Sequence, residues 1–533
     1  MAYNTNTYFV IFLPVVMLLY QLTPKKMRFM TLLIASVAFF MLISKHLIYW
    51  ALITTAITYF GGITIEAIFN KSKDEIKRAK AEGIEIDKKA IKKVAEKKAK
   101  HIVALSILAV VAILAGLKYT NFTLEMMNAA MSGMGKSTHF KALHILVPIG
   151  ISFYTMQAVG YLLDVYWKRI EAEKNILKLT LFMIFFPTLM EGPICRYTDL
   201  KDQLFEGEPI TGDSIVQGFI RIVWGLFKRM LIADRLNTAV NIFYKPTNSY
   251  NGLMVFVATV VTTIQLYMEF SGTIDIIIGS ARIFNIKLPE NFRQPFFAKS
   301  AAEFWRRWHI SLGTWFKNYI FYPVSTSKIM KKWNKFGRKH AGKYITAVVT
   351  SAIALFPVWM LNGLWHGPKV PYIMYGVYYF VILLLEVMLE PVGEKFWTAL
   401  HFKTDEPFVN RVRMVRTWVV ILVGEVLFRA ETLGQFVSMM KNMFVGPWDG
   451  NFFGGRILEV GLDLGDYAVV IVASIVVFYM DYKLEKNPEL FEQIPKMSTA
   501  KRWAVYYALI MAIVIFGAYG VGYQPADLIY AGF

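Results

Sequence analysis

The sequence predicts an all-α, polytopic membrane protein, and three observations support this fold class. First, 56% of the 533 residues are hydrophobic and the mean hydropathy is +0.43, which is too apolar for a soluble chain of this length. Second, apolar stretches that match a hydrocarbon core of about 30 Å recur along the whole chain. Third, basic residues cluster between these stretches. Because lipid cannot satisfy backbone hydrogen bonds, each spanning stretch is expected to be helical.

Thirteen apolar stretches are candidates for membrane-spanning helices. We expect roughly 11–14 such helices, together with re-entrant or interfacial ones. The first stretch is followed rather than preceded by basic residues, and no small-residue cleavage site follows it, so it is expected to be a retained helix rather than a signal peptide. The candidates are residues 8–22, 28–44, 47–69, 102–120, 143–165, 176–190, 214–233, 252–268, 344–362, 371–391, 413–428, 467–482 and 503–523.

Residues 71–100 are highly charged and nearly free of aromatic side chains. Opposite charges alternate along this segment, and a weak helical stripe of isoleucine and valine follows it. Because cytosolic loops collect lysine and arginine, we expect a charged cytosolic helical hairpin at about residues 70–100. No repeat, linker or low-complexity tract divides the chain, so the sequence predicts a single membrane domain over residues 1–533.

The formal net charge of +20 is explained by membrane topology rather than by nucleic-acid binding. The basic clusters at 71–100, 328–343 and 411–416 lie between apolar stretches, where the positive-inside rule places cytosolic loops. We therefore expect the lipid bilayer as a partner and no nucleic acid. The single cysteine, Cys195, excludes an intrachain disulfide framework and a cysteine-based zinc site. We expect no metal and no bound cofactor.

Residues 285–323 mix tryptophans, prolines and charges too closely for an ordinary spanning helix. Such an amphipathic mixture is typical of a membrane interface. The segment is either an anchoring interfacial helix or a re-entrant helix that lines a polar cavity, and its composition favours neither. Its aromatic and charged residues include Trp305, Arg306, Arg307, Trp308, His309, Trp315 and Lys317.

Two of the eight histidines lie in aromatic, apolar surroundings. His366 follows a long apolar run in the stretch LNGLWHGP, and His309 precedes it in FWRRWHISL. An ionisable group at membrane depth is costly and is therefore a functional candidate, although a solvated histidine at the head-group level would be inert. Imidazole can take a proton from a hydroxyl that attacks an ester or thioester carbonyl. Two imidazoles that meet in one cavity therefore predict base catalysis.

Glu269 and Asp275 are carboxylates within an apolar stretch. Either one can orient an imidazole, bind a proton in a transporter, or simply pair with Arg282. The residues alone leave these three roles open.

Five motifs follow one another along the chain. They are VPIGISFYTMQAVGYLLDVY (147–166), FFPTLMEGPICRY (185–197), YMEFSGTIDIIIGSARIFNIKLPENFRQPF (267–296), FWRRWHISLGTWFKNYIFYP (304–323) and NGLWHGP (362–368). In sequence and in order they resemble the membrane-bound O-acyltransferase superfamily, in its bacterial branch typified by alginate O-acetyltransferase membrane proteins. Together with the hydropathy profile, this resemblance covers nearly the whole chain.

The resemblance implies helices around a through-membrane tunnel, with His366 and His309 as the catalytic residues. It also implies transfer of an acyl group, most simply acetyl from acetyl-CoA, from the cytoplasm to hydroxyls of an extracellular or cell-envelope polysaccharide. An extracytoplasmic SGNH or esterase-like partner and a place in a bacterial cytoplasmic membrane are expected as well. The residues expected to line the tunnel or contact substrate are Asn362, Trp365, Trp305, Arg306, Trp308, Glu269 and Asp275.

Three alternatives stay open at this point. D-alanyl transfer from a carrier-protein thioester to teichoic acid is the alternative within the superfamily, although that branch has shorter chains. A transporter of polysaccharide or lipid would use the histidines and carboxylates as a proton relay, but we find no inverted repeat that favours one. A structural scaffold would leave His366 unexplained.

Overall fold

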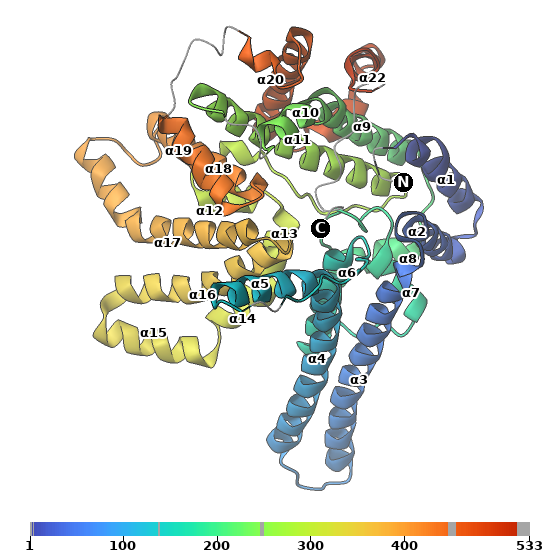
Figure 1. The fold of residues 1–533 in the computed structure, drawn as a ribbon. Helices are drawn as coiled ribbons and strands as arrows, with labels where there is room; N and C mark the ends of the chain where they lie inside the picture. Colours follow the sequence, from blue (N-terminus) through green and yellow to red (C-terminus); the bar gives the residue numbers. More distant parts are fainter. Residues whose placement is uncertain (1–2, 4, 137–138, 246–249, 446–454, 520–533) are drawn as a thin grey trace. The chain divides into compact units, whose positions relative to one another are not determined.

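The computed structural model describes residues 3, 5–136, 139–245, 250–445 and 455–519 (Figure 1). Regular structure within these residues is helical, apart from one isolated antiparallel bridge between Phe292 and Trp308. This confirms the predicted all-α class. The chain divides into two compact units. The N-terminal unit comprises Met1–Ser214 and Ala281–Leu288, and the C-terminal unit comprises Ile215–Ser280 and Pro289–Phe533.

The N-terminal unit is built on the long helices α3 and α4. A single turn of π-helix, Thr7–Phe12, leads into its first helix. Its helices are α1 (Leu13–Leu22), α2 (Arg28–Ser44), α3 (Ile48–Ala81), α4 (Lys88–Lys118), α5 (Thr120–Gly133), α6 (Ile151–Tyr166), α7 (Ile176–Ile184) and α8 (Tyr197–Glu206), and α9 (Gly212–Lys228) begins within it.

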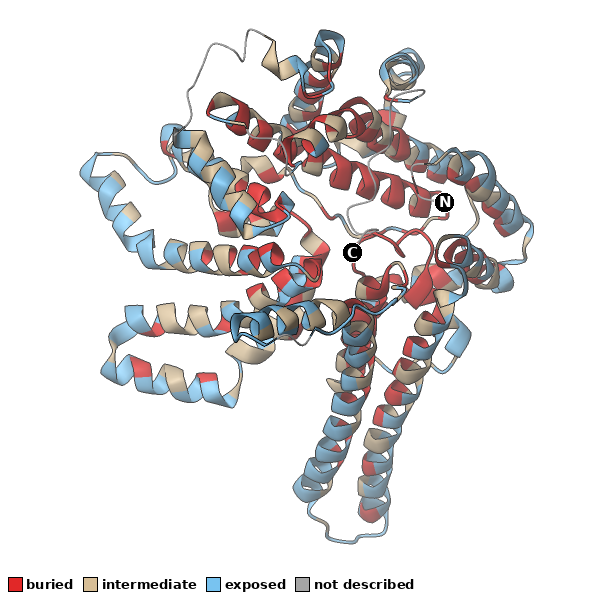
Figure 2. Cartoon of the chain, in the orientation of Figure 1, coloured by how far each residue is buried: buried red, intermediate tan, exposed pale blue. Residues whose placement is uncertain are grey.

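Helices α3 and α4 lie side by side as a hairpin (Figure 1). At 1.5 Å per residue, the 34 residues of α3 extend about 50 Å, well beyond a hydrocarbon core of about 30 Å. The charged end of the hairpin is mostly exposed (Figure 2). The Asp87 carboxylate caps α4 by accepting hydrogen bonds from the backbone N–H groups of Lys89 and Ala90 at 2.9 and 3.0 Å, which fixes the point where the chain turns back.

The C-terminal unit contains the predicted histidine sites. Its helices are α10 (Asp234–Phe243), α11 (Leu253–Ile283, whose last residues belong to the N-terminal unit), α12 (Ala301–Arg307), α13 (Ile310–Phe316), α14 (Tyr322–Ser325), α15 (Lys328–His340), α16 (Gly342–His366), α17 (Val370–Ala399), α18 (Pro407–Arg429), α19 (Leu433–Val445), α20 (Leu464–Lys486), α21 (Leu490–Gln493) and α22 (Thr499–Phe516).

Glycines allow α16 and α17 to pack closely. A Cβ on Gly363 would lie 2.4 Å from the carbonyl oxygen of Tyr372, and one on Gly376 would lie 2.3 Å from that of Trp359. Both distances are far inside van der Waals contact, so a larger residue would push the two helices apart. This contact determines where the C-terminal end of α16 lies.

Seven helical segments of the described residues are long and apolar enough to cross a membrane. They are Lys25–Ala81, Lys88–Lys118, Leu253–Ile283, Gly342–His366, Val370–Ala399, Leu464–Lys486 and Thr499–Phe516. The first of them holds two of the predicted spans, α2 and α3. In contrast, the predicted span 176–190 contains a helix of only nine residues, α7, whose later residues are buried by protein. Hydropathy responds to both environments, since protein interiors and lipid are equally apolar.

Candidate active site

The first candidate, His309, lies at a sharp break between α12 and α13. Its φ and ψ angles are 45° and 53°, in the left-handed region, and the preceding Trp308 is extended. A non-glycine residue in this conformation costs about 1–2 kcal/mol, so the surroundings must hold it there. Two backbone hydrogen bonds do so on either side of the histidine. Arg293 N–H donates to the Arg307 carbonyl at 2.9 Å, and Ile310 N–H donates to the Asn291 carbonyl at 3.0 Å.

Asn291 also fixes the imidazole of His309. This asparagine is fully buried, and its side-chain oxygen accepts hydrogen bonds from Ser311 N–H at 3.0 Å and from the Ser311 hydroxyl at 2.9 Å. The Nδ1 atom of His309 lies 3.2 Å from the same oxygen. Because the backbone N–H identifies that atom as an acceptor, Nδ1 must donate, and a neutral imidazole then has its lone pair on Nε2. Burial lowers the pKa of His309, which favours this neutral ring.

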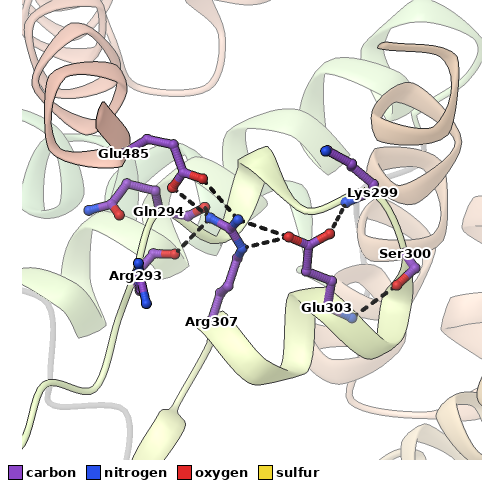
Figure 3. Close-up of polar contacts among 7 residues, drawn as sticks. All are labelled: Arg293, Gln294, Lys299, Ser300, Glu303, Arg307 and Glu485. Carbon is purple, nitrogen blue, oxygen red and sulfur yellow. Dashed lines mark hydrogen bonds and ion pairs between the residues drawn. The ribbon is translucent and has the colours of Figure 1, made fainter. Parts of the chain in front are cut away.

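Arg307 anchors the break from the other side (Figure 3). Its guanidinium forms two hydrogen bonds with Glu485 of α20, at 2.7 and 2.9 Å, and two with Glu303, at 3.1 and 2.8 Å. Burial alone would raise the pKa of Glu303, but the Lys299 N–H and the Arg307 guanidinium hold it below its usual range. Bidentate hydrogen bonds between a guanidinium group and a carboxylate are directional. Arg307, two positions before His309, is therefore held in place against α20.

The N-terminus of α12 is fixed by Glu386 of α17. Its carboxylate accepts hydrogen bonds from the backbone N–H groups of Ala301 and Ala302 at 2.8 and 3.0 Å. A carboxylate at this end also complements the helix dipole. The Ser300 side chain caps the same helix by accepting from Glu303 N–H at 3.0 Å. Helix α12 is therefore held at both ends.

The second candidate, His366, is the last residue of α16 and is buried. The helix stops there because Gly367 has φ 148° and ψ 174°, a region open essentially to glycine alone. The imidazole packs against the rings of Phe428 and Tyr375, with centroid distances of 5.0 and 5.8 Å. The sequence left open whether His366 is solvated or buried, and the structure places its side chain among buried aromatic rings.

Trp365 brings the two histidines into one cluster. The centroid of its ring system lies 5.5 Å from that of His309 and 5.0 Å from that of His366. The Phe270 ring also contacts His309 in a T-shaped arrangement, with 4.9 Å between the ring centroids. Two imidazoles that are 57 positions apart in the sequence thus flank a single indole.

The other expected site residues fall into different places. Asn362 is buried one turn before His366, and no described residue donates a hydrogen bond to its side-chain oxygen. Trp305 packs against Trp359 and Tyr379, at 4.9 and 4.8 Å between ring centroids. The remaining tryptophan, Trp308, is buried against Phe292 and Phe304, and Arg306 is exposed.

The two carboxylates of α11 have cationic neighbours. Asp275 forms ion pairs with Arg221 and Lys228, both at 2.6 Å. Glu269 accepts a hydrogen bond from the Gln265 side chain at 2.9 Å and lies 3.9 Å from the guanidinium of Arg229. The ion-pairing alternative therefore describes Asp275 best, but its partners are Arg221 and Lys228 rather than the expected Arg282. Most of this charge network is buried.

Comparison with known proteins identifies the family of this chain. Residues 172–423, which include both histidines, match the model of the membrane-bound O-acyltransferase family. The probable alginate O-acetylase AlgI of Pseudomonas syringae pv. tomato is 31% identical over 84% of this chain and 76% of its own length. The chain belongs to the membrane-bound O-acyltransferase family. This membrane-bound O-acyltransferase is thus a multi-pass membrane enzyme, as predicted, rather than a transporter or a scaffold.

Relatives of this O-acyltransferase are named for different activities. The peptidoglycan O-acetyltransferase of Helicobacter pylori is 27% identical over 64% of this chain and 64% of its own length. The teichoic acid D-alanyltransferase of Bacillus subtilis is 29% identical over 47% of this chain and 64% of its own length. The family therefore defines the acyl-transfer chemistry, while donor and acceptor differ among its members.

The residues that hold His309 in this acyltransferase were not singled out by the sequence. Asn291, Glu386 and Glu485 contact the α12–α13 region from distant parts of the chain. Asn291 lies in the quoted motif LPENF, but a neutral amide in a loop has no periodicity that singles it out. Its neighbours include the charged residues Glu290 and Arg293, so the polarity of the segment does not single it out either.

Proposed function

We propose that this enzyme transfers an acetyl group from cytoplasmic acetyl-CoA to hydroxyls of an exported or cell-envelope polysaccharide. Alginate O-acetylases align over 84–93% of this chain, a larger share than the peptidoglycan and teichoic acid relatives. The activity in their names supports acetyl as the acyl group and a polysaccharide as the acceptor. An extracytoplasmic SGNH or esterase-like protein relays the group to the polymer, and the enzyme lies in a bacterial cytoplasmic membrane.

In this proposal His366 is the general base. The imidazole takes the proton from the acceptor hydroxyl while the hydroxyl oxygen attacks the thioester carbonyl, forming the new C–O bond. The C–S bond then breaks, and the coenzyme A thiolate leaves and takes up the proton. A positioned base of this kind contributes about 10²- to 10⁴-fold in rate. Asn362, one turn earlier on the same face of α16, orients the hydroxyl.

His309 is the second catalytic residue of the proposal. With Nδ1 donating to Asn291, the neutral ring has an acceptor at Nε2 and can bind a hydroxyl or thiol proton there. Trp365 packs against this ring and against His366. Tryptophans 305, 365 and 308 provide the apolar walls of a through-membrane tunnel.

One observation supports this function above the others. Trp365 contacts both imidazoles, and one of the two is held in a defined tautomer by a buried asparagine. Packing alone does not require a tautomer, whereas proton transfer does. D-alanyl transfer from a carrier protein uses the same chemistry and is supported by the teichoic acid relatives, which align over a smaller share of the chain.

The function is tested by measuring ester-linked acyl groups on surface polysaccharides. Cells lacking the gene are supplied with the intact chain, with His366→Ala, or with His144→Ala, all at equal membrane abundance. His144 is an exposed histidine outside the site and serves as the matched control. We expect acetyl ester to be lost with His366→Ala by at least about 10²-fold and retained with His144→Ala.

Two outcomes would contradict the proposal. Normal acetyl ester with His366→Ala would remove the histidine from the chemistry. Ester-linked D-alanine in place of acetyl would keep the chemistry and replace the donor, and purified enzyme given labelled acetyl-CoA or an aminoacylated carrier separates these cases directly.

A further inference from the structure

A basic groove lies in the N-terminal unit at the base of the α3–α4 hairpin. Its volume is about 620 Å³, within the range of about 300–1,000 Å³ that small-molecule sites occupy. The walls come from α3, α4 and the connection from α6 to α7, and they include Phe69, Lys73, Lys77, Lys92, Lys168 and Arg169. The hairpin that forms two of these walls is the part of the chain that the positive-inside rule assigns to the cytosol.

The groove has more cations than its own acids neutralise. Five basic side chains line it, against two acidic ones, Glu66 and Glu171. The Glu66 carboxylate is already used, since it accepts a hydrogen bond from Ala172 N–H at 2.7 Å. Arg169 pairs with Asp164 at 3.0 Å. The four lysines form no salt bridge with any described residue, so the groove presents a positive field to the solvent.

The loop after α6 is shaped to present its cations here. Lys168 has φ 60°, in the left-handed region, which is uncommon for a residue with a Cβ. Its N–H donates to the Val165 carbonyl at 3.0 Å, and Arg169 N–H donates to the Asp164 carbonyl at 2.9 Å. These bonds close the turn. The Lys168 ammonium group lies 3.9 Å from the centre of the Phe69 ring, which fixes a cation beside an aromatic face.

We propose that this groove binds the phosphate groups of a nucleotide-linked acyl thioester of the coenzyme A type. This inference rests on the proposed function and deepens it by giving the donor a docking site. Coenzyme A has several phosphates and an aromatic base, which match the lysines and Phe69. A carrier protein would instead need a broad docking face of about 800 Å², whereas this site is a small concave groove.

The test is direct binding of coenzyme A to the purified full-length protein in lipid nanodiscs. The groove variant is Lys73→Glu with Lys92→Glu. The matched control is Lys80→Glu with Lys93→Glu, which makes the same charge change on exposed lysines of the same two helices outside the groove. We expect the groove variant to bind coenzyme A at least about tenfold more weakly and the control to bind within about twofold of the unaltered protein.

Binding measured with altered ligands and at different salt concentrations identifies the chemical group that the groove recognises. Binding should weaken when the 3′-phosphate is removed, in dephospho-coenzyme A, and should fall as salt rises. Equal affinity of the groove variant and the unaltered protein would overturn the inference. Equal losses of coenzyme A affinity in both double variants would also overturn it, because the general positive charge of the hairpin would then explain the binding. Binding of an acyl carrier protein without binding of coenzyme A would overturn it as well.

The measurement of coenzyme A binding does not depend on acyl transfer. If coenzyme A binds in the groove but no acyl ester forms from any donor, the proposed function fails and the site stands. If His366-dependent acetyl transfer proceeds with unaltered coenzyme A affinity in the groove variant, the site fails and the function stands.

Discussion

Replacing Asn291 by alanine tests whether the tautomer of His309 matters to catalysis. The substitution removes the acceptor of three hydrogen bonds, from Ser311 N–H, the Ser311 hydroxyl and His309 Nδ1. A buried donor left without a partner costs roughly 1–3 kcal/mol. If the lost Nδ1 hydrogen bond alone raises the free energy of the transition state by this amount, the rate of transfer falls by about 5- to 150-fold. The other two bonds contribute to folding, so the free energy of unfolding should fall as well.

The assay is the rate of transfer of labelled acetyl by purified enzyme, together with its pH profile. Asn291→Asp places a carboxylate beside Nδ1, which raises the pKa of His309 by favouring the imidazolium. The lone pair on Nε2 is then lost at a higher pH, so the acid limb of the rate profile should move upward. A purely structural role would lower the rate at every pH without this shift.

A double-mutant comparison separates positioning from folding. In a His309→Ala enzyme, Asn291→Ala should lower kcat no further, because its effect acts through the absent imidazole. Independent, additive losses in the double variant, or a single Asn291→Ala variant with unaltered kcat and an unaltered pH profile, would refute the reasoning.

Two further predictions concern stability in detergent, measured as the temperature at which half of the protein loses its monodisperse state. Gly363→Ala should destabilise the protein by about 1–3 kcal/mol, because its Cβ would meet the Tyr372 carbonyl at 2.4 Å; unaltered stability would mean that α16 and α17 separate freely. The folded-state pKa of Glu303 is below its usual value, so its stabilising effect is present above the unfolded-state pKa near 4.5 and is lost as the pH falls through the folded-state pKa. Glu303→Gln should therefore make stability fall less steeply as the pH is lowered. The same dependence of stability on pH in the variant and in the unaltered protein would exclude this role.

The sequence predicted the fold class and singled out both histidines as candidates for the same physical reason. Apolar stretches of spanning length have few structural alternatives, and an imidazole such as His366 is conspicuous where ionisable groups are costly. The extent of the spans was less predictable. Residues 176–190 are as apolar as a span, yet α7 is short and much of it is buried by protein. Apolar composition alone does not distinguish a lipid-facing helix from one enclosed by other helices.

The supports of the site were not predictable from sequence because they are tertiary. Asn291 acquires its role only when a loop folds against the α12–α13 break. The carboxylate Asp275 was a candidate partner of an imidazole until the structure placed Arg221 and Lys228 beside it. Neither contact has a spacing along the chain that pattern reasoning recognises, since the partners come from different helices.

The Arg307–Glu485 contact joins the segment that matches the family model to a helix outside that segment. The segment shared with the family, residues 172–423, contains both histidines and Arg307, whereas Glu485 lies beyond it on α20. A piece of chain limited to the shared segment would keep every proposed catalytic group and lose a carboxylate that holds the turn before His309. The proposed reacting groups thus lie within the segment that matches the family model, while part of the support that holds them comes from a helix outside it.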